Sequence, residues 1–378
     1  MRVSCLQENL AKGLSIVSRA VAARSTLPVL GNILIETDQS RLKLAATNLE
    51  IGISCWIGAK VDEDGGTTVP ARTFVDLINA LPQGQVDMDL AVKTQTLSVR
   101  CGRFANNVKG VDKEEFPIIP KPDENNAIHI APDALRQMID QVVFAAAADE
   151  SRPILTGVLA KFSGKTLTLA AADGFRLSVR TTALEDGVDE PLEVIIPARA
   201  LAELGRISGD QTDPISITVT PQRSQILFHL TNIDLVSQLI DGKFPDYTAI
   251  IPKATITKTI VDTGLLLKAC KAANVFAREA ANIVRVNIVP GDELTPSHIT
   301  IGATSAETGD NAGDLDASVT GTPIEIAFNV KYLIDVLNVA GANQVSLETS
   351  HPSAPGILRP IGDDAFTHVI MPMHIGGR

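Results

Sequence analysis

Apolar residues recur at intervals of three and four positions in six stretches of the chain. In the first stretch the spacing is set by Leu10, Leu14 and Val17, with mostly polar or small residues between them. This period places the apolar side chains on one face of an α-helix. The pattern therefore predicts amphipathic helices at residues 8–24, 71–81, 133–147, 198–208, 264–279 and 329–340.

Between these stretches, apolar positions alternate with polar ones, as they do in half-buried strands. The alternation predicts strands at residues 33–37, 41–46, 157–162, 166–171, 215–219, 225–230 and 298–303. The order strands, helix, strands, helix recurs along the chain. We therefore expect an α+β fold in which helices pack on antiparallel sheets.

The pattern of elements reflects a repeat of the sequence itself. The segment PVLGNILIETDQSRLKLAATNLEIGIS, from Pro28, aligns without a gap with PILTGVLAKFSGKTLTLAAADGFRLSV, from Pro153. A diverged third copy includes residues 298–305. Proline-rich connectors follow Phe116 and Phe244. Repeats of this length are full domains, and we expect three of them, at residues 1–122, 127–252 and 254–378.

Composition narrows the class of protein. With 45% hydrophobic residues, the 378-residue chain is able to bury a core in each domain. Its four cysteines lie far apart, which is typical of free thiols in a reducing compartment. The N-terminal residues lack the apolar core of a signal peptide, and no apolar run approaches the length of a membrane span. We expect a soluble, cytoplasmic protein that does not associate with a membrane.

The net charge of −11 argues against a protein that coats a nucleic acid with its whole surface. The predicted helices nevertheless carry eleven basic and seven acidic residues, so the excess of acid lies on the rest of the chain. Lys12 and Arg19 are seven residues apart, as are Arg199 and Arg206, and this spacing places each pair on one helix face. A solvated helix face explains any one pair. Together they favour a weakly positive helical surface that contacts phosphates without sequence preference.

No motif in the sequence supports catalysis. Residues 164–166 resemble the end of a phosphate-binding loop, but Leu159 stands where that loop needs a glycine, so we interpret them as a hairpin turn. The acidic segment 307–316 departs from a calcium loop at Ala312 and Leu315 and is interpreted as a solvated loop. We expect no metal and no cofactor. An enzyme whose site is assembled between domains, with acidic loops that bind a metal, is the alternative from another class.

Several segments together resemble a known family, the bacterial DNA polymerase III β subunits or DNA sliding clamps. The resemblance extends from Leu6 to Ile375. The segments that carry it are RSTLPVLGNILIE at 24–36, RPILTGVL at 152–159, AADGFRLSV at 171–179, FPDY at 244–247, FNVKYLIDVL at 328–337 and VIMPM at 369–373.

The resemblance implies three clamp-type domains per subunit, each with two helices and antiparallel sheets, and a head-to-tail homodimer that closes a six-domain ring. The implied function is that of a processivity factor without a catalytic site, which encircles double-stranded DNA and tethers replication and repair proteins to it. The implied partners are DNA, a second copy of the chain, the DNA polymerase III catalytic subunit, the clamp loader and other proteins with clamp-binding motifs. A clamp paralogue that acts as an inhibitor-resistant or sequestering copy is the alternative within the family.

The family binds partner peptides in a pocket between its second and third domains. The resemblance places this pocket at Leu155, Ala172, Gly174, Phe175, Arg176, Leu177, Pro245, Ile250, Asn329, Tyr332, Val369, Ile370, Met371, Pro372 and Met373. Apolar walls and two flexible methionines suit the leucine and phenylalanine anchors of a partner peptide. The chain departs from the common family residues at Ala172, Phe175, Ala249 and His374, so we expect a more apolar pocket.

The resemblance also implies DNA contacts and a dimer interface. The expected DNA-binding residues are Arg24, Arg72, Arg152 and Arg199. Asn106 and Val108 fall at the expected first-domain side of the interface.

Overall fold

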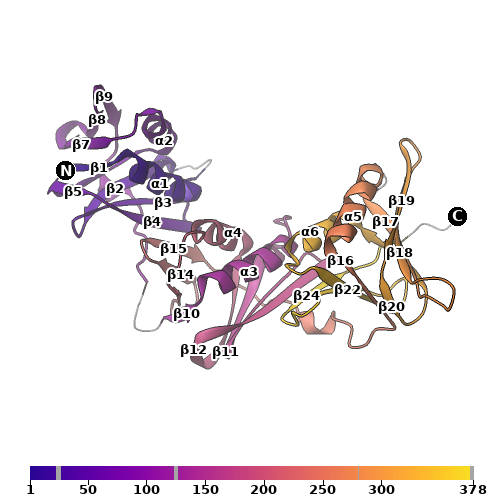
Figure 1. Ribbon diagram of the computed structural model, residues 1–378. Coiled ribbons are helices and arrows are strands. Elements are labelled where there is room, and N and C mark those ends of the chain that lie inside the picture. Colours follow the sequence, from indigo (N-terminus) through magenta and orange to yellow (C-terminus); the bar gives the residue numbers. More distant parts are fainter. Residues whose placement is uncertain (23–26, 123–126, 280, 375–378) are drawn as a thin grey trace. The chain divides into compact units, whose positions relative to one another are not determined.

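The computed structural model describes residues 1–22, 27–122, 127–279 and 281–374, which form two compact units (Figure 1). Unit 1 comprises Met1–Asp133, Leu184–Asp186 and Arg199–Leu239. Unit 2 comprises Ala134–Ala183, Gly187–Ala198 and Ile240–Arg378. The second sequence repeat is therefore divided, with some of its elements in each unit.

In the described part of the chain, a helix is present at each of the six predicted places. The helices are α1 (Gln7–Val17), α2 (Ala71–Ala80), α3 (Pro132–Val142), α4 (Ala198–Ile207), α5 (Thr263–Ala277) and α6 (Val330–Val339). Helices α2, α4, α5 and α6 agree with the predicted bounds to within two residues, whereas α1 and α3 end several residues early, because the chain tightens into 3-10 turns at Ser18–Ala20 and Val143–Ala145. Pro70 directly precedes α2, where its missing N–H removes no helical hydrogen bond.

Unit 1 contains two antiparallel sheets. The smaller has the strand order β5 (Lys60–Glu63), β1 (Arg2–Leu6), β7 (Gln85–Ala91), β8 (Thr96–Cys101) and β9 (Phe104–Lys109). The larger has the order β10 (Ile128–Ile130), β13 (Ile215–Val219), β14 (Gln225–Leu230), β15 (Ile233–Gln238), β4 (Ile51–Gly58), β3 (Arg41–Thr47), β2 (Asn32–Asp38) and β6 (Gly66–Pro70). The pairing of β15 with β4 joins strands of the first and second repeats.

The two faces of the larger sheet are covered differently. Helix α1 packs on one face, where Gly13 is needed because a Cβ there would lie 2.8 Å from Leu44 Cδ1. On the opposite face, Phe116 of the connector packs in a small apolar cluster with Leu34 and Ala45. The connector that follows the first repeat is thus held against the sheet.

Unit 2 also contains two antiparallel sheets. The first has the order β11 (Gly157–Ala172), β12 (Arg176–Pro197), β24 (Phe366–Ile370), β23 (Gly356–Pro360), β22 (Gln344–Thr349), β16 (Thr257–Asp262) and β20 (Ser318–Thr320). The second has the order β19 (Gly309–Asp316), β18 (His298–Ser305), β17 (Ile283–Val289) and β21 (Ile324–Asn329). Here β12 pairs with β24, and so joins the second and third repeats.

Two strand regions differ from the sequence prediction. One continuous strand, β11, replaces the two strands predicted between residues 157 and 171, with the irregularity at Gly164, where φ is 55° and the register with β12 shifts on both sides. The prediction of a solvated loop at residues 307–316 is wrong, because most of the segment forms β19. Its aspartates alternate with residues that face α5 and the core, and this alternation is the signature of a strand.

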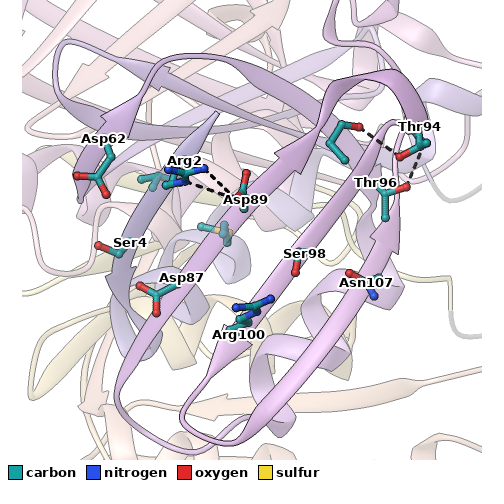
Figure 2. A pocket seen from close by; sticks show the side chains of 13 residues that line it. Arg2, Ser4, Asp62, Asp87, Asp89, Thr94, Thr96, Ser98, Arg100 and Asn107 are labelled. Carbon is teal, nitrogen blue, oxygen red and sulfur yellow. Dashed lines mark hydrogen bonds and ion pairs between the residues drawn. The ribbon is translucent and has the colours of Figure 1, made fainter.

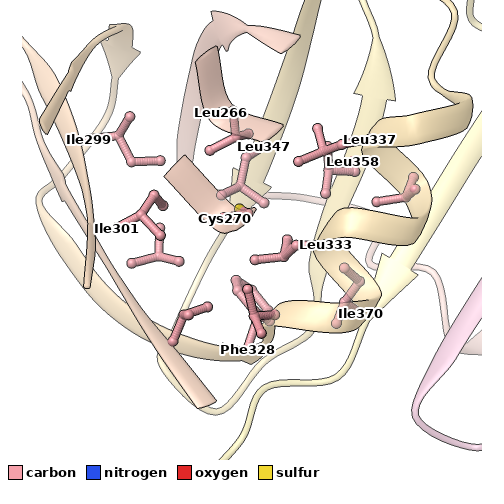
Figure 3. Packing of buried hydrophobic residues seen from close by; sticks show 14 of the residues in the cluster. Leu266, Cys270, Ile299, Ile301, Phe328, Leu333, Leu337, Leu347, Leu358 and Ile370 are labelled. Carbon is pink, nitrogen blue, oxygen red and sulfur yellow. The ribbon is translucent and has the colours of Figure 1, made fainter. Parts of the chain in front are cut away.

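The core of unit 2 lies between its sheets and helices α5 and α6 (Figure 3). Cys270 on α5, Ile301 on β18, Phe328 on β21 and Leu333 on α6 meet there and are fully or almost fully buried. All four cysteines are free, as predicted, and all are buried; burial raises the pKa of Cys270 to about 12. No helix among the described residues is long and apolar enough to cross a membrane.

Candidate functional site

Residues 172–177 form the turn that leads from β11 into β12, and the side chain of Asp173 shapes it. The Asp173 Oδ1 atom accepts hydrogen bonds from the backbone N–H groups of Phe175 (2.8 Å) and Arg176 (3.0 Å). Gly174 has a φ of 93°, a region that favours glycine. The turn leaves Phe175 exposed at its tip and directs Arg176 into the protein.

The ladder between β12 and β24 determines which apolar side chains lie near this turn. Leu177 pairs with Val369, and Arg176 pairs with Ile370. Because side chains alternate along a strand, Val369 packs in a cluster with Ala172 and Leu177, whereas Ile370 enters the core formed by α5 and α6. These predicted pocket residues are therefore buried packing residues, divided between the two faces of the sheet.

Arg176 is the centre of the arrangement. Its Nε donates to Asp173 (3.0 Å), its Nη1 to Asp335 (2.6 Å) and its Nη2 to the backbone carbonyl of Phe144 (2.8 Å). The guanidinium carbon lies 4.4 Å from the ring centre of Tyr332 and 5.3 Å from that of Phe144. Charge-assisted hydrogen bonds and stacking on two rings hold the guanidinium in one orientation. The turn is thereby fixed to helix α6.

Helix α6 presents the polar residues of this region. The Asn329 side chain caps the helix, because its Oδ1 accepts a hydrogen bond from a first-turn N–H (3.0 Å). Burial raises the pKa of the Tyr332 phenol; the carboxylates of Asp173 and Asp335 raise it too, and Arg176 opposes them. Tyr332 is half-buried, so its ring is held while part of it faces solvent.

Three of the predicted pocket residues have exposed apolar side chains. Phe175 is 55% exposed, Ile250 40% and Met371 37%. The Met371 N–H donates to the Phe175 carbonyl (2.8 Å), which extends the ladder by one step and keeps these two side chains near each other. We call the region formed by residues 172–177, 245–250, 329–332 and 369–373 the Arg176 surface.

The remaining predicted pocket residues have simpler surroundings. Leu155 is half-buried in the 3-10 turn Pro153–Thr156, Pro245 is exposed, and Pro372 and Met373 are half-buried. Ala249 and His374 are exposed. The sequence analysis missed Asp173, Asp335 and Phe144, which hold Arg176. A lone arginine inside an apolar segment was the available signal, since a buried cation needs partners.

The predicted DNA-binding residues are placed as follows. Arg24 lies outside the described residues. Arg72 on α2 and Arg199 on α4 are exposed, and they occupy equivalent positions of the repeats. Arg152 is exposed, but its Nη1 donates to the carbonyl of Asp173 (2.8 Å), so it braces the turn of the Arg176 surface.

Several helix bases of unit 1 are paired with acids, which the sequence count did not reveal. Lys12 lies 2.8 Å from Asp210, and both Arg19 (3.2 Å) and Arg206 (2.7 Å) contact Glu203. The positive charge of α1 and α4 is therefore partly neutralised. Lys12 and Asp210 are exposed, whereas the Glu203 side chain is largely buried, and all three pairs reduce the positive field of the helices.

Strands at the sheet edges carry opposite charge. Strand β9 is an edge of its sheet and has Arg103 and Lys109 at its two ends, whereas edge strand β19 carries Asp310, Asp314 and Asp316. The Asn106 amide nitrogen on β9 is buried without a hydrogen-bond partner among the described residues. Val108, the other predicted interface residue, is buried.

A hollow on the face of the smaller sheet of unit 1 has a volume of about 650 Å³ (Figure 2). Arg2, Asp87, Asp89 and Arg100 project into it from β1, β7 and β8, and Arg2 pairs with Asp89 (3.4 Å). In the part of the chain that the structure describes, no group of three or more histidine, cysteine, aspartate or glutamate residues is placed to hold a metal. The hollow is a polar sheet face, separate from the predicted sites.

Comparison with known proteins identifies the family. The models of the DNA polymerase III beta subunit match throughout: the N-terminal domain over residues 1–120, the central domain over 129–246 and the C-terminal domain over 248–374. The chain belongs to the DNA polymerase III beta subunit family. This membership confirms the resemblance, the α+β fold with three clamp domains, and the predicted function of a DNA sliding clamp, a processivity factor rather than an enzyme.

Relatives of this sliding clamp cover almost the whole chain. A beta sliding clamp of Staphylococcus aureus is 34% identical over 364 residues, 94% of both chains, and one of Synechocystis is 31% identical over 99% of this chain and 100% of its own length. The solved sliding clamp of Bacillus subtilis is similar with a TM-score of 0.93, 29% identity and 99% coverage of both chains. A beta subunit of Pseudomonas aeruginosa has a TM-score of 0.91 and 28% identity, covering 99% of this chain and 100% of its own.

The geometry around Arg176 predicts two opposite shifts of the Tyr332 pKa. In a Tyr247→Phe background, Tyr332 is the only tyrosine, because the chain has two. Asp335→Asn removes a nearby negative charge and should lower the phenol pKa, whereas Arg176→Gln removes the opposing cation and should raise it. Ultraviolet titration of the phenolate measures both. Shifts of the same sign in the two variants would contradict the described network.

Proposed function

We propose that the Arg176 surface binds a linear peptide of the partner proteins and so tethers them to DNA. The observation that carries this proposal is the pairing of exposed Phe175, Ile250 and Met371 with a rigid polar centre at Arg176 and Tyr332. Exposed apolar side chains give a peptide's leucine and phenylalanine anchors a place to bind, and methionine adapts to their shape. A preorganised centre lowers the ordering cost of binding.

The predicted pocket residues have two roles under this proposal. Ala172, Leu177, Val369 and Ile370 are the buried packing residues, and the exposed side chains make the contacts. Asn329 and Tyr332 supply polar contacts at the N-terminal end of α6. The proposed partners are the DNA polymerase III catalytic subunit, the clamp loader and other proteins with clamp-binding motifs. We also propose that the protein acts in the cytoplasm, which its four free cysteines support.

We further propose that two copies associate head to tail, with β9 of one copy beside β19 of the other, and close a six-domain ring around double-stranded DNA. An unpaired edge strand is a template for a second chain, and here the two edges have opposite charge. Exposed Phe104, at the start of β9, and exposed Val275, on the helix α5 that contacts β19, supply apolar area. Domain boundaries at 1–122, 127–252 and 254–378 are proposed with this ring, and the matched family models support them.

Helix residues Arg72 and Arg199, together with Arg24 and Arg152, are proposed to contact DNA phosphates. Equivalent positions in successive repeats would repeat one contact around the ring, without reading bases. The ring holds DNA by topology, so individual contacts need only be weak.

The first test concerns the peptide. Met371→Asp should weaken binding of a clamp-binding peptide from the host's polymerase III catalytic subunit by at least about tenfold, because it buries a charge against an apolar anchor. Fluorescence polarisation measures the affinity. Leu294→Asp is the matched control, since Leu294 is 95% exposed in the same unit and lies outside the surface. An equal loss of peptide affinity in both variants would contradict the assignment of the Arg176 surface as the peptide site.

The second test concerns the dimer. Replacing Arg103 and Lys109 by aspartate places like charges across the proposed interface and should raise the dimer dissociation constant by about tenfold. Adding lysine at Asp310 and Asp316 in the same chain should restore association. Sedimentation at low and high salt measures the dimer fraction. If the variant with all four substitutions dimerises again, the β9–β19 contact is supported. If that variant is folded but remains monomeric, the result argues against this contact.

The third test concerns DNA. Clamp loaded on a closed circle should remain bound at moderate salt and be lost when the circle is linearised. Arg72→Gln with Arg199→Gln should reduce the salt dependence of direct binding by about one unit of slope per lost phosphate contact, yet leave retention on closed circles intact. Retention that is indifferent to linearisation would contradict encirclement.

A further inference from the structure

The sequence repeat gives unit 1 its own copy of the elements that form the Arg176 surface. The connector sequence Ile118-Ile119-Pro120-Lys121 of the first repeat recurs as Ile-Ile-Pro-Lys from Ile250 onward. Strand β15 pairs with β4 as β24 pairs with β12. The surface that we propose to bind peptides in unit 2 therefore has a structural counterpart in unit 1.

The backbone of this counterpart follows the same plan. Asn48 Oδ1 accepts hydrogen bonds from the N–H groups of Glu50 (3.0 Å) and Ile51 (2.8 Å), as Asp173 Oδ1 does from the N–H groups of Phe175 and Arg176. The Gln238 N–H donates to the Glu50 carbonyl (2.8 Å), which reproduces the bond from Met371 to Phe175. Two sets of bonds at matching positions show that the turn, and not only the sequence, is repeated.

Leu49 stands in this turn where the other copy has Gly174. Its φ of 74° lies in a region that branched and bulky side chains rarely adopt. The side chain is also 50% exposed, so burial does not compensate for the strain. Strained, exposed apolar residues of this kind cluster at binding sites.

The connector adds a second exposed apolar side chain, that of Ile118, which is 95% exposed. Its neighbour Ile119 holds the connector on the sheet, because it packs where a Cβ at Gly52 would lie only 3.2 Å from its Cγ2 atom. Ile118 lines two adjoining hollows. One has a volume of about 90 Å³ and is bordered by Leu49 and Glu50, and the other has about 320 Å³.

The charges of the larger hollow define the ligand. Lys43, Lys113 and Lys121 line it, together with Glu36 and Glu114. Glu36 is paired with Lys113 at 2.7 Å. Lys43 and Lys121 form no close ion pair with any residue that the structure describes. The buried Asp234 carboxyl interacts with both lysines at longer range, and the two ammonium groups lie beside an exposed isoleucine. An acidic residue next to an aliphatic one complements this arrangement.

We propose that the surface formed by Lys43, Leu49, Ile118 and Lys121 is a second docking site, which binds an extended segment of another protein carrying acidic residues beside one aliphatic anchor. The aliphatic side chain enters between Leu49 and Ile118, and the acidic residues pair with Lys43 and Lys121. The inference rests on the proposed peptide-binding role of the Arg176 surface. A partner with two such segments would engage one subunit at two places and gain avidity.

The chain contains its own reporter for this site. Trp56 is the only tryptophan, and the Lys43 ammonium lies 5.8 Å from the centre of its ring. A ligand that draws Lys43 into an ion pair should therefore change Trp56 fluorescence. Three ten-residue synthetic peptides serve as probes, which are identical except for a central Asp-Asp-Leu, Lys-Lys-Leu or Asp-Asp-Ser.

We expect the Asp-Asp-Leu peptide to give a saturable fluorescence change. Each of the other two peptides should bind with at least fivefold lower affinity. Ile118→Asp and Lys121→Glu should each lower the affinity for the Asp-Asp-Leu peptide at least fivefold, and Tyr332→Ala should leave this affinity unchanged. Binding of the polymerase peptide by the Ile118→Asp variant shows that this variant is folded. Equal binding of all three probes, no saturable change, or loss in Tyr332→Ala alone would overturn the proposal.

The same set of variants keeps this inference separate from the proposed function. If the polymerase peptide fails to bind the wild-type chain, the Arg176 surface is wrong whatever the probes do. If that peptide binds and depends on Tyr332, while the Asp-Asp-Leu probe does not bind, only the second site is wrong.

Discussion

The ladder between β12 and β24 joins a strand of the second repeat to a strand of the third, and the rest of the Arg176 surface depends on its register. Pairing of Leu177 with Val369 sets Val369 into one apolar cluster and Ile370 into another. A slip of one residue would exchange these faces and expose a core residue on each side. The two apolar clusters therefore stabilise a single register of the ladder. That register brings Met371 beside Phe175. The Arg176 surface is a consequence of how the repeats are joined.

Much of the fold was predictable because period and repeat are properties of the sequence. Six helices were located from their apolar spacing, and the alternation predicted strands such as β13 and β14 at their observed bounds. The acidic segment that forms β19 was misread as a loop, since its aspartates were judged as possible metal ligands. Their alternation with Asn311, Gly313 and Leu315 was a strand pattern that outweighed their charge.

The site was predictable only in part. Its apolar members came from the family resemblance, but the partners that hold Arg176 did not. Asp335 is 159 residues from Arg176 along the chain, and Lys12 is 198 residues from Asp210. No local pattern reports such contacts, because they exist only once strands and helices have packed. The same limit applies to the helix charges, where a sum over residues misses the acids that pair with Arg19 and Arg206.

The turn at residues 48–51 and the turn at residues 173–176 share a backbone conformation but differ in their side chains. In unit 2, glycine at position 174 relieves the positive φ, and Arg176 anchors the turn through three partners. In unit 1 the anchoring residue is the buried Ile51, and Leu49 retains a strain of about 1–3 kcal/mol. Glycine or asparagine at position 49 would relieve that strain and keep the turn. A purely structural turn gains nothing from an exposed leucine there, so its presence is better explained by what the side chain contacts outside the chain.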